Sequence, residues 1–272
     1  MPKTPLLSII TINFNDKLGL QRTFDSVFNQ TFQDFEYIVI DGGSTDGSKE
    51  LIEKNSEKIS FWVSEKDAGI YNAMNKGTSA SNGEYLLFLN SGDHFKNENS
   101  LEVVAKNLGV EDIIYFDLEI IGENNTFVKE YPESLSFFYF YQNSLPHPST
   151  FIRKKLFDEF GFYDENLKIV SDWKWFIKPI TQNLCTYKKI SGIVSTFYQN
   201  GISSDPENLH NLEAERKIVA KEYFSEYIIY FEKIAALQEE NKSLQHYKRS
   251  YNHLKKYKIV QFLEKLGLVK IY

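Results

Sequence analysis

The fold is decided by residues 6–48, which read LLSIITINFNDKLGLQRTFDSVFNQTFQDFEYIVIDGGSTDGS. An Ile-rich apolar run of strand length opens this stretch, and helical spacing of apolar residues follows over Leu18–Gln30. A second apolar run, FEYIVID, then ends in the turn GGSTDGS. Short continuous apolar runs are typical of strands buried on both faces of a parallel sheet. The stretch therefore predicts a strand, a helix and a second, parallel strand.

The same alternation continues to residue 95. A helix is expected over Ser48–Asn55, a strand running into a loop at FWVSEKDAG (61–69), a helix over Ile70–Ser79, and a strand at EYLLFLN (84–90) that ends at SGD. Strands and helices that alternate at this spacing predict right-handed crossovers. The expected fold class is α/β, with a Rossmann-like, mostly parallel central sheet flanked by helices.

Beyond Phe95 the pattern is less regular. From about Leu209 the chain is expected to be almost entirely helical, which adds a helical C-terminal extension. The run FFYFY is either core or a lid over an acceptor cleft. Between Phe95 and Leu209 we expect a helix at 101–107, a strand at 113–121, a turn that becomes a helix at 146–161, a helix that ends at Pro179, and a closing strand or strand pair at 185–198.

The composition is that of an ordinary soluble globular protein, with 272 residues, 42% hydrophobic and 25% charged. A single cysteine, Cys185, excludes a disulfide framework and a Cys-rich zinc site, and favours a reducing compartment. No stretch approaches the about 20 apolar residues of a membrane span. The first residues lack a basic region followed by a long apolar one, so no signal peptide is expected. These observations predict a cytoplasmic protein.

The net charge of −6 is unevenly distributed. Residues 241–272 hold eight Lys and Arg and one acidic residue, Glu264, which gives +7, and the remaining 23 basic and 36 acidic residues give −13. A nucleic-acid enzyme usually carries its basic residues across its working face. The charge pattern therefore argues against a nucleic-acid partner and sets the tail apart as a separate module.

Acidic and amide residues follow successive predicted strands. In an open α/β sheet, ligands bind outside the carboxyl ends of the strands. Any one of these residues is most simply a turn former, but four successive strand ends suggest a site for a ribose or base edge and a hard divalent cation. SIITINFND offers no basic Gly-rich loop for a triphosphate, which argues against a nucleotidyltransferase. The residues are Asn13, Asn15, Asp41, Asp67 and Asp93.

Four segments in order, SIITINFN, VIDGGSTDGS, SEKDAGIYNAMNKG and GEYLLFLNSGD, resemble the signatures of the family 2 inverting glycosyltransferases of bacterial surface-polysaccharide synthesis. HPSTFIRKKLFDEFGFYDENLKIVSDWKWF resembles the acceptor half of that family and extends the resemblance to about residue 205. It implies the A-type nucleotide-sugar fold (GT-A). The implied domains are a catalytic domain at 1–208, with a nucleotide-sugar half at 1–95 and an acceptor half at 96–208, and a basic helical extension at 209–272.

The resemblance also implies roles for the strand-end residues. Asp41 would accept hydrogen bonds from the base or ribose, and Asp67 would contact the base. Asp93 matches the last acid of the metal-binding Asp-x-Asp, whose first acid is here Ser91. One carboxylate with diphosphate oxygens and waters still suits Mn²⁺ or Mg²⁺, although less tightly than two. The full nucleotide-sugar set is Thr11, Asn13, Asn15, Asp41, Asp67, Ser91 and Asp93.

In the acceptor half, Asp172 in the sequence SDW is the candidate general base, which must reach the acceptor hydroxyl. The alternative is that Ser171 or Asp172 caps the following helix. Trp173 stacks on a sugar ring or is core, and for Trp175 we favour core. His147 contacts the acceptor or the diphosphate, or is structural.

The expected reaction is inverting transfer of a hexose or N-acetylhexosamine from a nucleoside-diphosphate sugar, expected to be UDP-linked. The acceptor is a hydroxyl of a glycan or lipid-linked saccharide, in lipopolysaccharide or capsule synthesis. The alternative is a nucleotide-sugar-binding protein without transferase activity, because Asp-x-Asp is incomplete.

Two further segments carry open alternatives. QNGISS (199–204) resembles a flexible loop in which Ser203 contacts phosphate. Residues 237–272 form a partial heptad and an apolar face flanked by Lys. They would pair two subunits, lie peripherally on the anionic inner face of the plasma membrane, or pack on their own domain.

Overall fold

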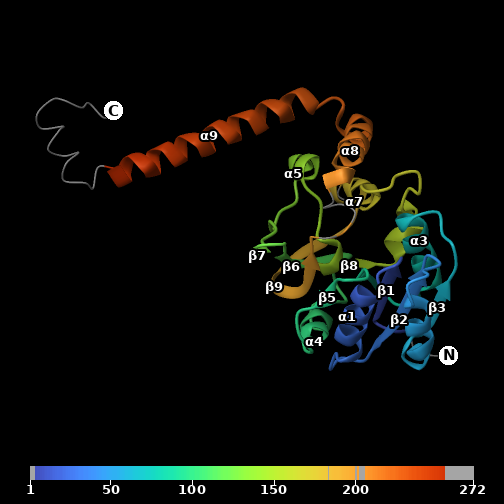
Figure 1. Cartoon of the computed structure of the whole chain (residues 1–272). Coiled ribbons are helices and arrows are strands. Elements are labelled where there is room, and N and C mark those ends of the chain that lie inside the picture. The colour runs from blue at the N-terminus through green and yellow to red at the C-terminus, as the bar shows by residue number, and fades with distance from the viewer. Residues whose placement is uncertain (1–3, 183, 200, 202–205, 255–272) are drawn as a thin grey trace, which may run out of the picture. The chain divides into compact units, whose positions relative to one another are not determined.

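The structure is a computed structural model that describes residues 4–182, 184–199, 201 and 206–254 (Figure 1). It divides into two compact units, 1–219 and 220–272, which are described separately. The strands are β1 (Leu7–Asn13), β2 (Phe35–Asp41), β3 (Phe61–Ser64), β4 (Tyr85–Phe88), β5 (His94–Phe95), β6 (Ile113–Ile121), β7 (Thr126–Lys129), β8 (Thr150–Arg153) and β9 (Tyr187–Tyr198). The α-helices are α1 (Lys17–Phe28), α2 (Ser48–Lys54), α3 (Ile70–Ala80), α4 (Ser100–Ala105), α5 (Phe137–Gln142), α6 (Lys155–Phe160), α7 (Ser171–Thr181), α8 (Leu209–Phe224) and α9 (Ile228–Leu254).

One sheet organises the first unit, in the order β3-β2-β1-β4-β8-β6-β9-β5, with β7 beside β6. The four strands from residues 7–88 pair in parallel, which confirms the predicted α/β fold. β8 runs antiparallel to both β4 and β6, so it joins the parallel half to a mixed half. The parallel strands end at one edge of the sheet, where polar side chains can gather.

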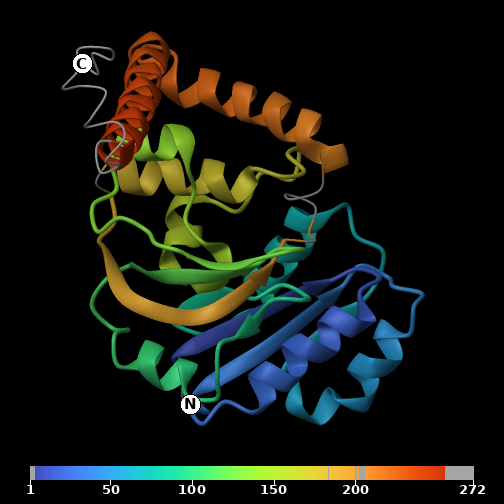
Figure 2. The ribbon, with the colours of Figure 1, turned by 60° about the vertical axis from the view of Figure 1, so that its left-hand side comes forward.

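Helices cover both faces of the sheet (Figure 2). On one face, Leu20 and Phe24 of α1 and Ile52 of α2 belong to the same core as Leu7 and Ile9 of β1. On the other face α3 packs against β1 and β2, with Gly77 close to Ile10. Neighbouring residues of β1 thus point to opposite faces, as the period of two requires.

Gly77 allows this close approach of α3 to the sheet. A Cβ added at Gly77 would lie 2.4 Å from Cγ2 of Ile10, which is shorter than any real carbon contact. Glycine has no Cβ and avoids the overlap, although glycine inside a helix is itself unfavourable. The sequence NKG at 75–77 therefore sets the distance between α3 and β1.

The second half of the unit differs from expectation in several elements. The segment predicted as a turn followed by a helix contains β8, because Thr150–Ile152 are buried and pair with strands on both sides. Its helix begins only at Lys155. The FFYFY run forms α5, capped by the Ser136 hydroxyl. α7 continues past Pro179 to Thr181, and residues 187–198 form one strand rather than two.

The second unit contains the end of α8 and α9, in which Phe224 and Phe231 pack with ring centroids 6.1 Å apart. Apolar side chains on α9 stay exposed, among them Leu237, Leu244 and Tyr247. Within the described ranges, no helix is both long and apolar enough to cross a bilayer. Residues 255–272 of the predicted interaction segment, and Ser203 of the predicted loop, lie outside the described residues.

Candidate active site

A cavity of about 940 Å³ opens at the carboxyl ends of the parallel strands. Its wall is built from the end of β1, the loops after β2, β3 and β4, the first turn of α3, and the end of β9. Of the predicted nucleotide-sugar residues it includes Asn13, Asn15, Asp67, Ser91 and Asp93. The structure thus brings together five residues that are up to 80 positions apart in the sequence.

Asn13 is the buried polar side chain of this wall, with 4% of its surface exposed. Its amide nitrogen donates to Oδ1 of Asp41 at 2.7 Å and to Oγ of Ser44 at 3.2 Å. Its Oδ1 is buried and accepts no hydrogen bond from the described residues. Because an unsatisfied buried acceptor is costly, this oxygen is suited to accept an N–H or O–H from a ligand.

Asp41 lies behind Asn13 and not on the cavity wall. Its Oδ1 accepts from Asn13 and from the Ser44 hydroxyl, and its Oδ2 accepts from the Ser44 N–H and the Ser64 hydroxyl. Burial opposes ionisation, but the hydrogen bonds from Ser44, Ser64 and Asn13 hold the pKa of Asp41 below its ordinary value. In this geometry Asp41 orients Asn13, and its own oxygens are occupied by protein donors.

Thr11 is not brought to the cavity, contrary to the expectation that it lines the pocket. It lies two residues before Asn13 on the same face of β1, and is therefore covered. Its hydroxyl donates to the carbonyl of Leu89 at 2.7 Å and is 2.9 Å from the Tyr37 hydroxyl. Thr11 ties β1 to β4 and β2 beneath the cavity floor.

Asn15 and Asp67 shape two of the loops that line the cavity. Asn15 adopts a positive φ of 51°, its N–H donates to Oγ of Ser44 at 2.7 Å, and its Oδ1 accepts from the N–H of Thr45. Asp67 accepts from the N–H of Gly69 at 3.0 Å, directly before α3. Both side chains are fixed by backbone groups, so they reach the cavity in defined positions.

Asp93 is the buried carboxylate of the cavity, with 6% of its surface exposed. Burial raises its pKa well above the ordinary value, and the backbone N–H of Tyr198 opposes this effect. Ser91, two residues earlier, donates to Oδ2 of Asp16 at 3.1 Å. No set of three His, Cys, Asp or Glu side chains suited to a metal is found in the part of the chain described here.

Asp16 and Tyr198 are among the wall residues that the sequence analysis did not assign to the site. Asp16 reads as a helix cap and does cap α1 through Oδ1, but its Oδ2 lies beside Ser91. Tyr198, at the end of β9, packs under the guanidinium of Arg22 at 4.2 Å. Asp16 could have been found from the sequence, because it follows Asn13 by three positions in the same strand-end loop. Nothing in the sequence indicates Tyr198, because it comes from a distant strand.

The candidate base Asp172 lies in the first turn of α7, and Val170 is the N-cap of that helix. Neither Ser171 nor Asp172 caps the helix with its side chain. Oδ1 of Asp172 accepts from the Tyr71 hydroxyl at 2.9 Å, which links the acceptor half to α3. The carboxylate is partly exposed, as a base that meets an external hydroxyl must be.

Trp173 is core, which is the second of its two alternatives, and it does not form a platform for a sugar ring. It is 3% exposed, its indole N–H donates to the carbonyl of Phe140 at 2.6 Å, and Arg216 covers its ring at 4.6 Å. Trp175 is core as favoured, stacked on Phe157 with ring centroids 4.5 Å apart. The two tryptophans anchor α7 rather than bind sugar.

His147 is half-buried among aromatic rings. Its Nε2 is 2.9 Å from the Tyr163 hydroxyl, and its ring stacks on Phe88 with centroids 4.9 Å apart. Burial lowers its pKa, with a weaker opposing effect from the charge of Asp172. The packing favours the structural alternative over contact with acceptor or diphosphate.

Comparison with known sequences identifies the family of the chain. The profile described as Glycosyl transferase family 2 matches residues 8–163, more than half of the chain. An uncharacterized glycosyltransferase of Mycobacterium tuberculosis is 31% identical over 212 residues, which cover 76% of this chain and 80% of that protein. A PGL/p-HBAD biosynthesis glycosyltransferase of Mycobacterium bovis is 28% identical, over 72% of this chain and 78% of that protein.

Solved structures support the fold. S. aureus TarS 1–349 in complex with UDP-GlcNAc has a TM-score of 0.61 at 19% identity, over 80% of this chain and 67% of that one. A mannosyltransferase from Pyrobaculum calidifontis in complex with GDP-Man and Mn²⁺ has a TM-score of 0.52 at 13% identity, over 71% and 57%. The chain spans 36% of a longer TarS structure. With its GT-A-like sheet and its profile match, the chain belongs to the family 2 glycosyltransferases.

Proposed function

We propose that the protein is an inverting, divalent-metal-dependent glycosyltransferase. It moves a hexose or N-acetylhexosamine from a nucleoside-diphosphate sugar, UDP-linked, onto a hydroxyl of a glycan or lipid-linked saccharide in surface-polysaccharide synthesis. The observation that carries the proposal is the strand-end cavity, in which Asn13 offers an unpaired buried acceptor and Asp93 a buried carboxylate. The UDP-GlcNAc bound by the TarS structure supports the choice of donor.

The donor nucleotide binds in this cavity. Oδ1 of Asn13 accepts the imide N–H of a uracil or a ribose hydroxyl, and Asp41 keeps the amide in that orientation through its bond to the amide nitrogen. Asp67, whose second oxygen is free of backbone bonds in the described residues, accepts from the base or ribose on the opposite wall. These contacts distinguish a nucleotide from a simple sugar phosphate.

Protein and donor together would hold the metal, Mn²⁺ or Mg²⁺. Asp93 and Asp16 both line the cavity, and the hydroxyl of Ser91 lies beside Asp16, so the donor set is all oxygen. Two carboxylates suit a hard cation that keeps waters and diphosphate oxygens as its other ligands. When bound, the cation neutralises charge on the leaving diphosphate.

Asp172 takes the proton of the acceptor hydroxyl. Inversion needs one such base, because the hydroxyl attacks the anomeric carbon opposite the leaving diphosphate. The proton moves to the carboxylate as the new glycosidic bond forms and the sugar–phosphate bond breaks. Asp172→Asn should abolish turnover with donor affinity intact, and full activity of that variant would remove Asp172 from the mechanism.

The alternative function is nucleotide-sugar binding without transfer, which is favoured by the incomplete Asp-x-Asp at Ser91. Slow, metal-dependent hydrolysis of the donor separates the two functions, because hydrolysis needs the machinery that stabilises the leaving group. A binding protein would hold the donor intact with and without metal.

The first test is calorimetric titration with nucleoside diphosphates and their sugars, with and without Mn²⁺. We expect metal-enhanced binding of UDP or a UDP-sugar, lost in Asp93→Ala and unchanged in Asp158→Asn, whose carboxylate is exposed on α6. Absence of nucleotide binding under every metal condition would contradict the proposed function.

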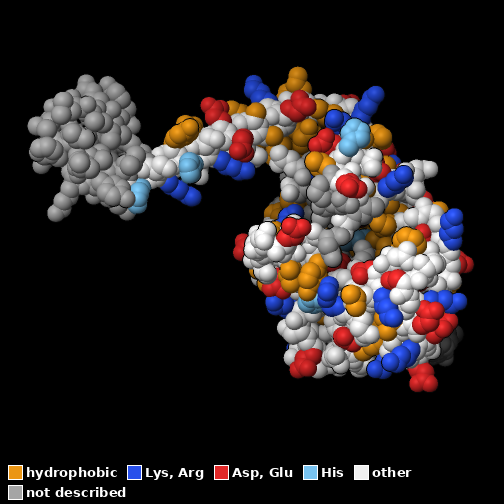
Figure 3. All heavy atoms as spheres, viewed as in Figure 1, with side chains coloured by type: hydrophobic (Ala, Val, Ile, Leu, Met, Phe, Trp, Pro, Cys, Tyr) orange, Lys and Arg blue, Asp and Glu red, His pale blue; other side chains and the backbone are white. Residues whose placement is uncertain are grey.

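For its surroundings, we infer a cytoplasmic protein that reaches lipid-linked acceptors through peripheral contact of residues 237–272 with the inner face of the plasma membrane. Dimerisation through the same segment is the alternative. Charges of both signs are interspersed over the visible face of residues 1–219 (Figure 3), unlike the basic stripe of a nucleic-acid-binding surface.

A further inference from the structure

Tyr71 connects the two halves of the site. It belongs to α3, its side chain is 5% exposed, and its hydroxyl donates to Oδ1 of Asp172 at 2.9 Å across 101 positions of sequence. Its oxygen in turn faces the backbone N–H groups of Ser171 and Asp172, at the start of α7. The hydroxyl therefore meets both the carboxylate and the backbone that carries it.

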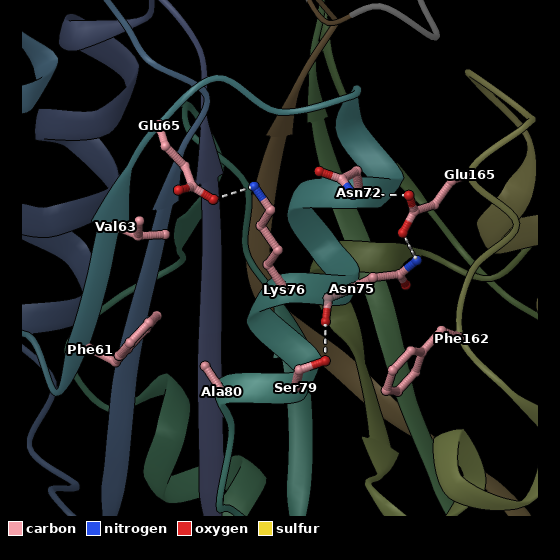
Figure 4. A pocket seen from close by; sticks show the side chains of 10 residues that line it. All are labelled: Phe61, Val63, Glu65, Asn72, Asn75, Lys76, Ser79, Ala80, Phe162 and Glu165. Carbon is pink, nitrogen blue, oxygen red and sulfur yellow. Dashed lines mark hydrogen bonds and ion pairs between the residues drawn. The ribbon is translucent and has the colours of Figure 1, made fainter.

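The helix that carries Tyr71 is held against the acceptor half on its other side. The Asn75 amide pairs with the backbone of Tyr163 in both directions, at 2.9 and 3.0 Å. Asn72 and Asn75 also donate to Glu165 at 2.9 and 2.8 Å, which Figure 4 shows across the shallow pocket beside α3. These bonds leave α3 little freedom to shift relative to the segment that precedes α7.

The same helix borders the donor cavity. Gly69, Ile70 and Ala73, from its first turn, line the cavity wall. Tyr71 lies between them in the sequence and points toward α7 instead. One rigid element thus contacts the donor site and the candidate base.

The hydroxyl is suited to donate rather than to accept a proton. Burial, then the charge of Asp172, raises the pKa of Tyr71 well above its ordinary value, so it stays protonated through the working range of pH. Oδ2 of Asp172 accepts no hydrogen bond from the described residues, whereas Oδ1 is occupied by Tyr71. The two carboxylate oxygens are therefore not equivalent.

We propose that Tyr71 is a positioning residue that holds Asp172 by Oδ1 and leaves Oδ2 directed at the acceptor hydroxyl. The proposal rests on the proposed function, since it assigns the base of that reaction a fixed orientation. Because α3 also borders the donor, the orientation of the base is set by the element that the bound donor contacts.

A purely structural alternative is that Tyr71 only satisfies the first N–H groups of α7, which have no side-chain cap from their own segment. In that case its loss would lower stability and leave the chemical step unchanged in the folded enzyme. The two possibilities differ in the kcat of the variant and in whether the change in kcat depends on Asp172.

The test is Tyr71→Phe in the full-length chain, measured by steady-state transfer from a UDP-sugar and by calorimetry. We expect kcat to fall about 10- to 100-fold, as for loss of a hydrogen bond to a charged group, with donor affinity unchanged. In an Asp172→Asn background, in which only residual turnover can be measured, the same change should lower that residual turnover no further.

The matched control is Tyr85→Phe. Tyr85 is also a buried tyrosine whose hydroxyl donates to an oxygen, the Glu111 carbonyl, and accepts a backbone N–H, from Gly109, but it lies away from the cavity. It should lower the thermal midpoint without changing kcat. A Tyr71→Phe enzyme with wild-type kcat, whatever its stability, would overturn the proposal.

The outcome is separable from that of the proposed function. If wild-type protein neither binds nor transfers a sugar nucleotide, the function fails. If it does both and Tyr71→Phe behaves like Tyr85→Phe, only the positioning role fails.

Discussion

Asn13 is the side chain that we expect to bind the sugar nucleotide most directly. Its nitrogen is bound by Asp41 and Ser44, and its buried oxygen is unpaired in the described residues. A ligand N–H or O–H that donates to this oxygen removes the free-energy cost of burying an unpaired acceptor. The hydrogen bond should therefore contribute more to affinity than one made to an exposed group.

We therefore expect Asn13→Ala to weaken binding of the nucleoside diphosphate about tenfold, which corresponds to about 1.4 kcal/mol. Calorimetric titration in Mn²⁺ measures the change. Asn107→Ala, in a side chain that bonds only the Val103 carbonyl, is the control. Unchanged affinity in Asn13→Ala would place the base elsewhere in the cavity.

His147 should make stability depend on pH. Burial lowers its pKa in the folded protein, so between that value and about 6.5 the unfolded chain binds the extra proton and the folded one does not. Stability from this group is complete above about pH 6.5 and is lost as pH falls through this window. From pH 7.5 to pH 5.5, the free energy of unfolding measured in urea should fall less in His147→Gln than in wild type. An equal fall in the two proteins would exclude this role.

Sequence spacing could place Asn13, Asp67 and Asp93 at one edge of the sheet, because strand ends follow from hydrophobic periodicity. It could not show that Asp41 is occupied by Ser44 and Ser64, since those partners come from separate loops. Nor could it show that Trp173 is covered, because Arg216 and Phe140 reach it from distant elements. Orientation and coverage depend on tertiary contacts that no local pattern encodes.

Helix α3 and strand β1 approach each other closely at Gly77. Gly77→Ala should destabilise the protein by about 1–3 kcal/mol, because its new Cβ meets Ile10 in a packed core. Chemical denaturation measures this change. Ser79→Ala, an exposed position of the same helix, serves as the control, and equal stability of both variants would show that α3 can shift outward at no cost.

The parallel strands and their helices were predictable because each buries a continuous apolar run. The mixed half was not, because β8 is a four-residue strand whose sequence TFIR reads equally as the start of a helix. Its identity as a strand follows from its pairing with β4 and β6. Ile152 pairs with Leu86, 66 positions earlier, and Thr150 pairs with Tyr115, 35 positions earlier, so no local pattern reveals these contacts. Short strands are specified by their neighbours more than by their own residues.

For the whole molecule, the cavity and the candidate base lie within residues 1–219. A chain that ends after Phe224, and so keeps α8, should bind the donor with wild-type affinity by calorimetry. Weakened binding by a folded, shortened chain would show that the second unit contributes to the donor site.

The exposed apolar residues of α9 and the basic residues beyond it predict a role outside catalysis. If the tail binds the membrane, the full chain should float with vesicles of anionic phospholipid at low salt, and the shortened chain should not. If it pairs subunits instead, sedimentation should report a dimer of the full chain without lipid. A full chain that is monomeric and does not float would favour the third alternative, in which residues 237–272 pack on their own domain.

The position of Tyr198 has a consequence for synthesis on the ribosome. One wall of the donor cavity comes from residue 13 and another from residue 198, so the pocket closes only when β9 pairs beside β5 and β6. During translation, the emerging parallel half presents the unpaired edge of β4 until β8 has been made, about 60 residues later, at roughly 5–20 residues per second. Such an edge invites pairing with other chains. The nascent protein is therefore most prone to aggregate, and most in need of a chaperone, after its parallel strands have been made and before β8 has paired with β4.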